Sequence, residues 1–394
     1  MIKAPPREIV EMKHYVSPKA VVDELKPEYP VYCVRPSAIH TPAKTFVHHF
    51  PGDTLYAVKC NPMPHMLQEL FEAGIRHFDT ASLAEISLVS HLLPEADCYF
   101  MHPVKARSAI REAHETHGVR HYVVDHVDEL QKISEIITPS KDIIIVVRLA
   151  LHHKAAMYDL SKKFGASVDV VLELLADADR RGFSSGVCFH VGSQCVDADA
   201  FRVGVELVRE VIQRTEVSLR CVDIGGGFPG HYLNNPVASL EDYIQTITQT
   251  INSLKLPEDC RVICEPGRGL ASEGESLIVQ VHLRKGNALY INDGLYGSMN
   301  EEAEGLQRLN RMVPTRAFSS KRKPFILNGP TCDSEDALPK PVELPEDINE
   351  GDWIEFGGVG AYGAACRTAF NGFYADTFVT VEDEFVADLS ESTT

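Results

Sequence analysis

The sequence is short of basic side chains. Its 394 residues include 38 lysines and arginines against 56 aspartates and glutamates, which gives a formal net charge of −18. A surface with this balance is poorly suited to neutralising a phosphate backbone, so nucleic acid is excluded as an expected partner. The acidity would suit a cationic substrate, but acidic proteins are common and charge alone is weak evidence.

Long apolar runs are also missing. No stretch approaches the ~18–20 apolar residues that a membrane span requires, and the first fifteen residues lack the apolar core of a secretory signal. We therefore expect no membrane association and a cytoplasmic location.

Cysteine is present but is not arranged in pairs. None of the ten cysteines forms a CxxC pair, and several lie in apolar runs such as GVCFHVG (186–192) and RVICEPG (261–267). This pattern argues against a disulfide framework and a structural metal site, and it favours buried, reduced thiols in a cytosolic protein.

Short apolar runs alternate with longer amphipathic segments over about residues 54–269. The apolar runs are rich in β-branched residues and continuously apolar, as expected of strands that are buried on both faces. They are 54–59, 76–81, 98–102, 121–125, 142–150, 185–192, 219–227 and 261–269. Segments with helical spacing separate them, for example 66–74 and 199–215. Eight such repeats predict an α/β fold, a (β/α)8 barrel, with a doubly wound open sheet as the alternative.

The pattern changes after about residue 275. Runs typical of strands, separated by turns, cover 277–293, 323–329, 351–363 and 372–383. We expect a barrel domain over 30–275 and a mostly β, sandwich-like domain formed by 1–29 and 276–394.

The polar residues of the barrel segment gather where the predicted strands end, which is where barrels of this kind carry their functional groups. They are Lys59, Asp79, Arg148, His190, Ser193, Gly225, Gly226, Gly227, Glu265 and Arg268. Each has an ordinary structural explanation by itself: a lysine emerging at a strand end, a tight glycine turn, a Glu265–Arg268 ion pair or a core histidine. Their occurrence together at one rim favours a functional site.

One cofactor would use this whole set. Pyridoxal 5′-phosphate (PLP) needs a lysine for its Schiff base, donors for its phosphate and a carboxylate for its ring nitrogen. A flat side chain stacked on the ring helps to hold it.

The motifs also resemble those of a known family. YAVKCN, FDTAS, FHVGSQ, DIGGGFPG, EPGRG, YINDGLYGS, GPTCDSED, GAYG and AFNGF are together very specific. The chain resembles the fold-type III PLP decarboxylases, the ornithine/diaminopimelate group, over nearly its full length. The resemblance implies an alanine racemase-like fold, with a barrel and a C-terminal β domain, and a head-to-tail homodimer with two shared active sites.

The resemblance implies a role for each matching residue of the barrel. Lys59 would form the Schiff base, His190 would stack on the ring and Glu265 would pair with the ring nitrogen. Asp79 and Arg148 would form a supporting polar pair near the Schiff base. The phosphate would be held by Ser193, Gly225, Gly226, Gly227 and Arg268, together with Tyr362 of the second domain.

It also implies residues contributed by the partner subunit. Cys332 would protonate Cα after carbon dioxide leaves, Asp333 would bind the distal ammonium of the substrate, and Phe370 would line the same interface. A cysteine thiol is a suitable acid, because its unperturbed pKa of ~8.5 leaves it mostly protonated at neutral pH.

Some details favour the branch that acts on basic amino acids. CDSED places an aspartate beside the cysteine, and AFNGF occurs as in ornithine decarboxylases. The segment YGSMNEEAEG departs from the ornithine pattern, because it carries glutamates where an aspartate is usual, and we expect Glu301 to make the second contact with the amine. The predicted activity is decarboxylation of L-ornithine to putrescine and also of L-lysine to cadaverine. The alternatives are a diaminopimelate decarboxylase and an inactive regulatory homologue; the presence of Lys59 and Cys332 argues against the second.

Overall fold

The computed structural model describes residues 11–151, 156–158 and 162–388, and these fall into two compact units. The barrel unit comprises His40–Pro229 and Val237–Leu270. The sheet unit comprises the described parts of Met1–Ile39, Gly230–Pro236 and Ala271–Thr394. The sequence predicts one domain over 30–275 and a second domain formed by 1–29 and 276–394. These domain limits stay a prediction.

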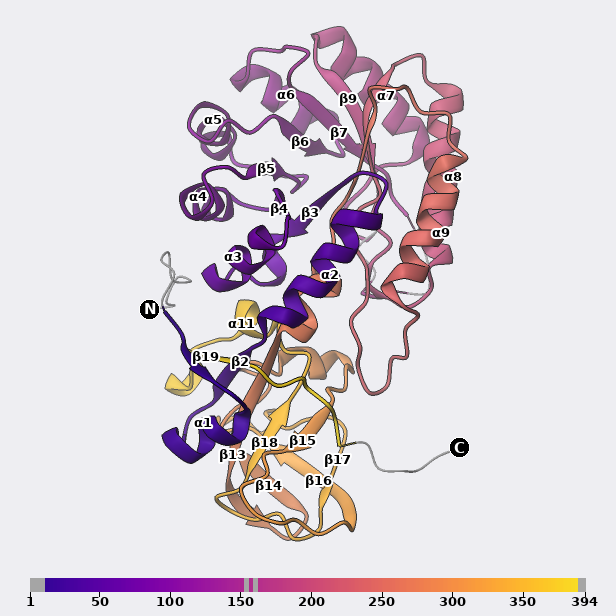
Figure 1. Ribbon diagram of the computed structural model, residues 1–394. Helices are drawn as coiled ribbons and strands as arrows, with labels where there is room; N and C mark the ends of the chain where they lie inside the picture. Colours follow the sequence, from indigo (N-terminus) through magenta and orange to yellow (C-terminus); the bar gives the residue numbers. More distant parts are fainter. Residues whose placement is uncertain (1–10, 152–155, 159–161, 389–394) are drawn as a thin grey trace. The chain divides into compact units, whose positions relative to one another are not determined.

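The barrel unit confirms the predicted (β/α)8 fold. Eight parallel strands close into a barrel in the order β11-β12-β3-β4-β5-β6-β7-β9. Figure 1 labels β3 to β7 and β9 among them. In chain order the strands are β3 (Asp53–Ala57), β4 (His77–Thr80), β5 (Asp97–Phe100), β6 (His121–Val124), β7 (Ile144–Arg148), β9 (Ser184–Cys188), β11 (Leu219–Asp223) and β12 (Arg261–Cys264). The alternative, a doubly wound open sheet, is thereby excluded.

Helices alternate with these strands. They are α2 (Pro36–His49), α3 (Pro64–Glu72), α4 (Leu83–Leu92), α5 (Arg107–Glu115), α6 (Val127–Ile136), α7 (Val168–Arg181), α8 (Asp199–Arg214) and α9 (Leu240–Asn252). Helix α8 shows why the pattern folds this way: Phe201, Val205 and Val208 recur at helical spacing and all are buried. The short strands β8 (Ala156–Tyr158) and β10 (Ser193–Cys195) pair outside the barrel.

The barrel interior is filled with side chains, so the unit has a packed core. Leu55, Tyr99, Val146, Cys188 and Ile263 belong to one buried cluster of inward-facing residues. With the interior closed in this way, chemistry is left to the ends of the strands.

The sheet unit is built on one nine-stranded sheet, whose main path runs β1-β19-β2-β13-β14-β16-β17, with β18 pairing β13 and β15. Its strands are β1 (Lys13–Tyr15), β2 (Val31–Val34), β13 (Glu275–Lys285), β14 (Ala288–Ile291), β15 (Asn310–Met312), β16 (Arg322–Asn328), β17 (Val342–Pro345), β18 (Trp353–Phe356) and β19 (Thr377–Val381). Its helices are α1 (Pro18–Leu25), α11 (Gly363–Cys366) and the short η2 (Ser272–Gly274), η3 (Asn300–Glu304) and η4 (Phe370–Gly372). This mostly β unit confirms the second element of the predicted fold class.

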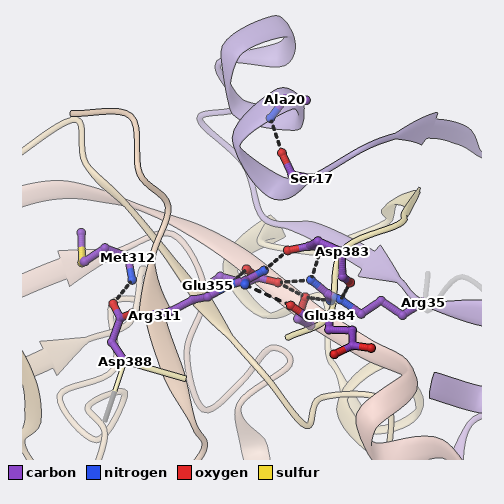
Figure 2. A network of polar contacts seen from close by, with 10 residues as sticks. Ser17, Ala20, Arg35, Arg311, Met312, Glu355, Asp383, Glu384 and Asp388 are labelled. Carbon is purple, nitrogen blue, oxygen red and sulfur yellow. Dashed lines mark hydrogen bonds and ion pairs between the residues drawn. The ribbon is translucent and has the colours of Figure 1, made fainter. Parts of the chain in front are cut away.

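A buried charge network ties the chain after β19 to this sheet (Figure 2). Glu355 is fully buried, and its two carboxylate oxygens accept from Arg35 at 2.7 Å and from Arg311 at 2.6 Å. Both arginines also pair with Asp383. A buried charge is tolerated only when it is paired, so the network fixes the segment around Asp383 against the end of β2 and against β15.

Two further observations bear on the sequence expectations. All ten cysteines are free thiols, and seven of them are buried. Within the part of the chain that the structure describes, no helix combines the length and the apolar character needed to cross a membrane.

Candidate active site

The polar residues singled out in the barrel segment lie at the carboxyl ends of the barrel strands. Asp79 lies in β4, and Arg148 is the last residue of β7. The others lie in segments that follow a barrel strand. These are Lys59 after β3, His190 after β9, with Ser193 beginning the short strand β10, Gly225, Gly226 and Gly227 after β11, and Glu265 after β12, with Arg268 beginning the short helix α10 (Arg268–Ala271).

Lys59 lies in a single 3₁₀ turn, η1 (Val58–Cys60), between β3 and α3. The side chain of Asn61 closes the connection by accepting from the Met63 N–H at 3.1 Å, and Pro64 then begins the helix. The Lys59 ammonium is 2.5 Å from Oδ2 of the buried Asp79. The contact with Asp79 holds the ammonium in place. The lysine side chain is nevertheless 43% exposed, so it remains accessible.

His190 is held as a neutral ring. Burial, followed by the positive charges of Arg148 and Lys59, lowers the pKa of His190 well below its ordinary value. Its Nδ1 accepts from the Gly192 N–H at 2.9 Å, which places the remaining proton on Nε2. An uncharged imidazole in a fixed orientation suits the predicted stacking role.

The glycine run after β11 comes into close contact with the rest of the rim. Gly225 and Gly227 have φ of +68° and +111°, which side-chain-bearing residues rarely adopt. A Cβ on Gly226 would lie 2.5 Å from the Glu265 carbonyl oxygen and 3.1 Å from Nε2 of His190. Only glycine leaves the backbone this close to the rim side chains.

Two donors suited to an anion lie nearby on the chain segments that follow β9 and β12. Arg268 Nη2 donates to Ser193 Oγ at 3.4 Å, and Arg268 is only 3% exposed. A guanidinium and a hydroxyl held together match the predicted phosphate donors.

Glu265 provides a direct test of fit for the cofactor. The residue is 9% exposed, and its Oε1 is buried without a hydrogen-bond donor among the described residues. Burial and then the neighbouring Asp223 raise the pKa of Glu265 well above its ordinary value. A protonated ring nitrogen would supply the missing donor, so the residues present fit PLP.

Asp223 is a site residue that the sequence reasoning missed. It ends β11, is fully buried, and its carboxyl lies within hydrogen-bonding reach of Glu265. The available signal was an acid directly before the glycine run, in VDIGGG.

The other predicted site residues belong to the sheet unit. Cys332 and Asp333 lie in an irregular segment after β16, and the Cys332 N–H donates to Asn371 Oδ1 at 2.9 Å. The Tyr296 hydroxyl donates to the Asp333 carboxylate and lowers the pKa of that carboxyl. The Tyr296 ring packs on Phe370 with centroids 4.7 Å apart, so the structure brings this predicted group together.

Asp336 anchors the segment that carries Cys332, and the sequence reasoning missed it too. It is 2% exposed, and its carboxylate accepts from the Leu295 N–H at 2.8 Å, the Thr331 N–H at 3.0 Å and the Thr331 hydroxyl at 2.7 Å. The Asp336 oxygens lie so close to Gly329 that a Cβ there would be 2.3 Å away.

Two predicted residues have partners within the sheet unit. Glu301 in η3 is 7% exposed and lies 3.9 Å from the guanidinium of the buried Arg308. Tyr362, at φ +59°, precedes α11, and its carbonyl accepts from Asn300 at 3.3 Å. The roles of Glu301 with the amine and of Tyr362 with the phosphate stay predictions.

Comparisons with known proteins agree with this chemistry. Residues 37–272 match the model of the pyridoxal-dependent decarboxylases, pyridoxal binding domain. A lysine/ornithine decarboxylase of Selenomonas ruminantium is 32% identical over 356 residues, which cover 87% of this chain and 88% of that protein.

Solved structures of similar proteins cover nearly the whole chain. A lysine/ornithine decarboxylase from Vibrio vulnificus, complexed with putrescine, has a TM-score of 0.80 at 27% identity and covers 93% of this chain and 99% of its own. An arginine decarboxylase of Paramecium bursaria Chlorella virus, bound to agmatine, has a TM-score of 0.79 at 26% identity, with 92% and 100% covered.

Proposed function

This chain belongs to the pyridoxal-dependent decarboxylases, and from that premise we propose that it decarboxylates L-ornithine to putrescine and L-lysine to cadaverine. The proposal names Lys59 and Cys332 as the catalytic residues. The observation that carries the cofactor chemistry concerns the rim that also holds Lys59. There the Oε1 of Glu265 is buried and has no donor in the part of the chain that the structure describes.

PLP, when bound, supplies an electron sink for the pair of electrons left at Cα when the carboxyl group departs. Lys59 would hold the cofactor covalently through Nζ, with Asp79 orienting the amine. Glu265 would accept from the ring nitrogen and keep it protonated. His190 would cover one face of the ring, which excludes water from it.

The phosphate would lie against the glycine run. Backbone N–H groups of Gly225, Gly226 and Gly227 are available because no Cβ intervenes, and such groups bind anions well. Arg268 and Ser193 add a charged and a neutral donor, and Tyr362 adds its hydroxyl. Arg148 supplies positive charge close to His190.

The residues of the sheet unit would act in a homodimer with shared sites. In this assembly Cys332 of one subunit delivers the proton to Cα after carbon dioxide leaves, and Phe370 lines the interface. The exposed position of Cys332 supports this role, because a proton donor must reach the substrate of another subunit.

Recognition of the substrate would depend on Asp333. An ammonium taken out of water needs a carboxylate partner. The Tyr296 hydroxyl lowers the pKa of Asp333 and so keeps the carboxylate charged. Glu301 would contribute a second negative charge, directly or through water.

Ornithine and lysine differ by one methylene, which a pocket discriminates by only about 1–3 kcal/mol, or roughly 10–200-fold. Both amino acids should therefore react, ornithine faster. Diaminopimelate should fail because its second carboxylate would face Asp333, and arginine should fail because its guanidinium is bulkier.

The test is to identify the product formed from each amino acid. Purified enzyme with PLP is incubated separately with L-ornithine, L-lysine, L-arginine and diaminopimelate, and diamines, agmatine and lysine are separated by chromatography. Putrescine and cadaverine should form, and the Lys59→Ala variant should form neither. Agmatine alone, or lysine from diaminopimelate alone, would contradict the proposal.

A further inference from the structure

Two carboxyl groups are buried side by side in the barrel rim. Asp223 ends β11, and Glu265 follows β12, the strand that pairs in parallel with β11 and places Ile263 opposite Asp223. Asp223 is fully buried, and its Oδ1 accepts from the Gly225 N–H at 2.8 Å. Its Oδ2 and the Oε1 of Glu265 are both buried without a donor among the described residues.

If both carboxyl groups were ionised, neither could donate a hydrogen bond to the other. A proton on one of them supplies the donor. The two side chains lie within hydrogen-bonding reach of each other, but ionised carboxylates only accept hydrogen bonds. Two adjacent buried negative charges would repel each other strongly, and such pairs hold one proton between them.

We infer that Asp223 and Glu265 share one proton, and that Asp223 takes it when Glu265 faces the ring nitrogen of the cofactor. No proton leaves the pair in this step, because the proton moves from one carboxyl to the other. Asp223 then donates to Glu265, and Glu265 is left as the carboxylate that the ring nitrogen needs. Asp223 is thus a positioning residue; this inference rests on the role proposed above for Glu265.

The surroundings support a protonated pair. The charged groups that act on it are Asp79, Lys59 and Arg148, and the titratable groups packed nearby are His190, Cys188, Cys221 and Cys264. Burial is the largest effect on Asp223 and raises its pKa to about 7, against the opposing effects of the Gly225 N–H, of Glu265 and of Arg148. Burial also keeps the three thiols and His190 uncharged.

Asp223→Asn is the matched variant, because an asparagine has the shape of a protonated aspartate. Its oxygen can accept from the Gly225 N–H while its amide donates to Glu265. Asp223→Ala removes both contacts, so Glu265 loses the hydrogen bond that orients its carboxylate.

The first readout is the urea unfolding of the cofactor-free enzyme at several pH values. The pKa of Asp223 is raised from 3.8 to about 7, so the folded wild type binds more protons than the unfolded chain in this window. Its stability therefore falls as pH rises towards 7. Asp223→Asn lacks this titration, so the ratio of the two unfolding constants should change by up to about tenfold per pH unit between about pH 4 and 7. If the difference in unfolding free energy between wild type and Asp223→Asn did not depend on pH, the shared proton would be overturned.

The second readout is the dissociation constant of PLP, measured by absorbance titration of the cofactor-free variants. Asp223→Asn should bind PLP within about threefold of wild type, and Asp223→Ala should bind about 10–100-fold more weakly. Weak binding by Asp223→Asn would overturn the positioning role.

The pH comparison of wild type with Asp223→Asn stands even if the alanine variant does not fold. If the proposed substrates are wrong, only the product assay will show it, and the unfolding comparison and the PLP dissociation constants will be unchanged. A wrong substrate assignment can therefore be distinguished from a wrong assignment of the shared proton.

Discussion

Asp336 gives the most quantitative prediction for the sheet unit. The perturbation is Asp336→Asn, which keeps the size of the side chain and replaces one carboxylate oxygen by an amide. One oxygen of Asp336 accepts from the Leu295 N–H, and the other accepts twice from Thr331. The asparagine should keep its oxygen towards Thr331 and turn its amide towards the Leu295 N–H, where two donors then meet.

The expected cost follows from this geometry. One hydrogen bond to a charged group is lost at a buried position, which corresponds to about 2–3 kcal/mol of unfolding free energy. Thr331→Val removes only the hydroxyl contact and should cost about 1 kcal/mol. Glu335→Gln, at an exposed neighbouring position, is the control and should cost almost nothing.

The assay combines urea unfolding with steady-state kinetics. The segment anchored by Asp336 carries Cys332 and Asp333, so its displacement should lower kcat at least about tenfold. The absorption spectrum of bound PLP should stay unchanged, because the groups proposed to hold its ring, Lys59, His190 and Glu265, lie in the barrel unit. If Asp336→Asn were as stable and as active as Glu335→Gln, the anchoring role would be refuted.

Three further outcomes are expected. Borohydride reduction of the holoenzyme should fix the cofactor on Lys59, which mass spectrometry of the digest would show, and Lys59→Ala should lose nearly all activity; labelling of another lysine would contradict the rim assignment. Mixing inactive Lys59→Ala and Cys332→Ala chains under conditions of proven subunit exchange should restore up to about a quarter of wild-type activity, whereas no recovery would contradict shared sites. Tyr296→Phe removes the hydrogen bond that lowers the pKa of Asp333, so that pKa should rise and KM for ornithine should increase as pH falls; an unchanged KM–pH profile would argue against this role of Asp333.

Much of the barrel could be predicted because its strands are short, apolar and regularly spaced. The structure ends several of them earlier than the apolar runs suggest. The run 219–227 becomes β11 (Leu219–Asp223), because Gly225 and Gly227 adopt positive φ and turn the chain away from the sheet. The functional residues therefore follow the strands more often than they lie in them, as Lys59 in its 3₁₀ turn shows.

What the sequence did not reveal depends on contacts between distant segments. VDIGGG shows an acid beside glycines, but only the pairing of β11 with β12 places Asp223 against Glu265. Asp336 likewise looks like one of several acids in CDSED, and its role becomes visible only when Leu295 and Thr331 are found to donate to it. The local pattern identifies residue types, whereas burial and partners come from the fold.

The central claim, that this enzyme acts on basic amino acids with a single α-carboxyl group, is tested most directly by kcat/KM. The measurement compares L-ornithine, L-lysine and diaminopimelate on one preparation of holoenzyme. The account predicts the highest value for ornithine, a value for lysine lower by no more than roughly 10–200-fold, and no measurable turnover of diaminopimelate. Efficient turnover of diaminopimelate with ornithine inert would contradict it.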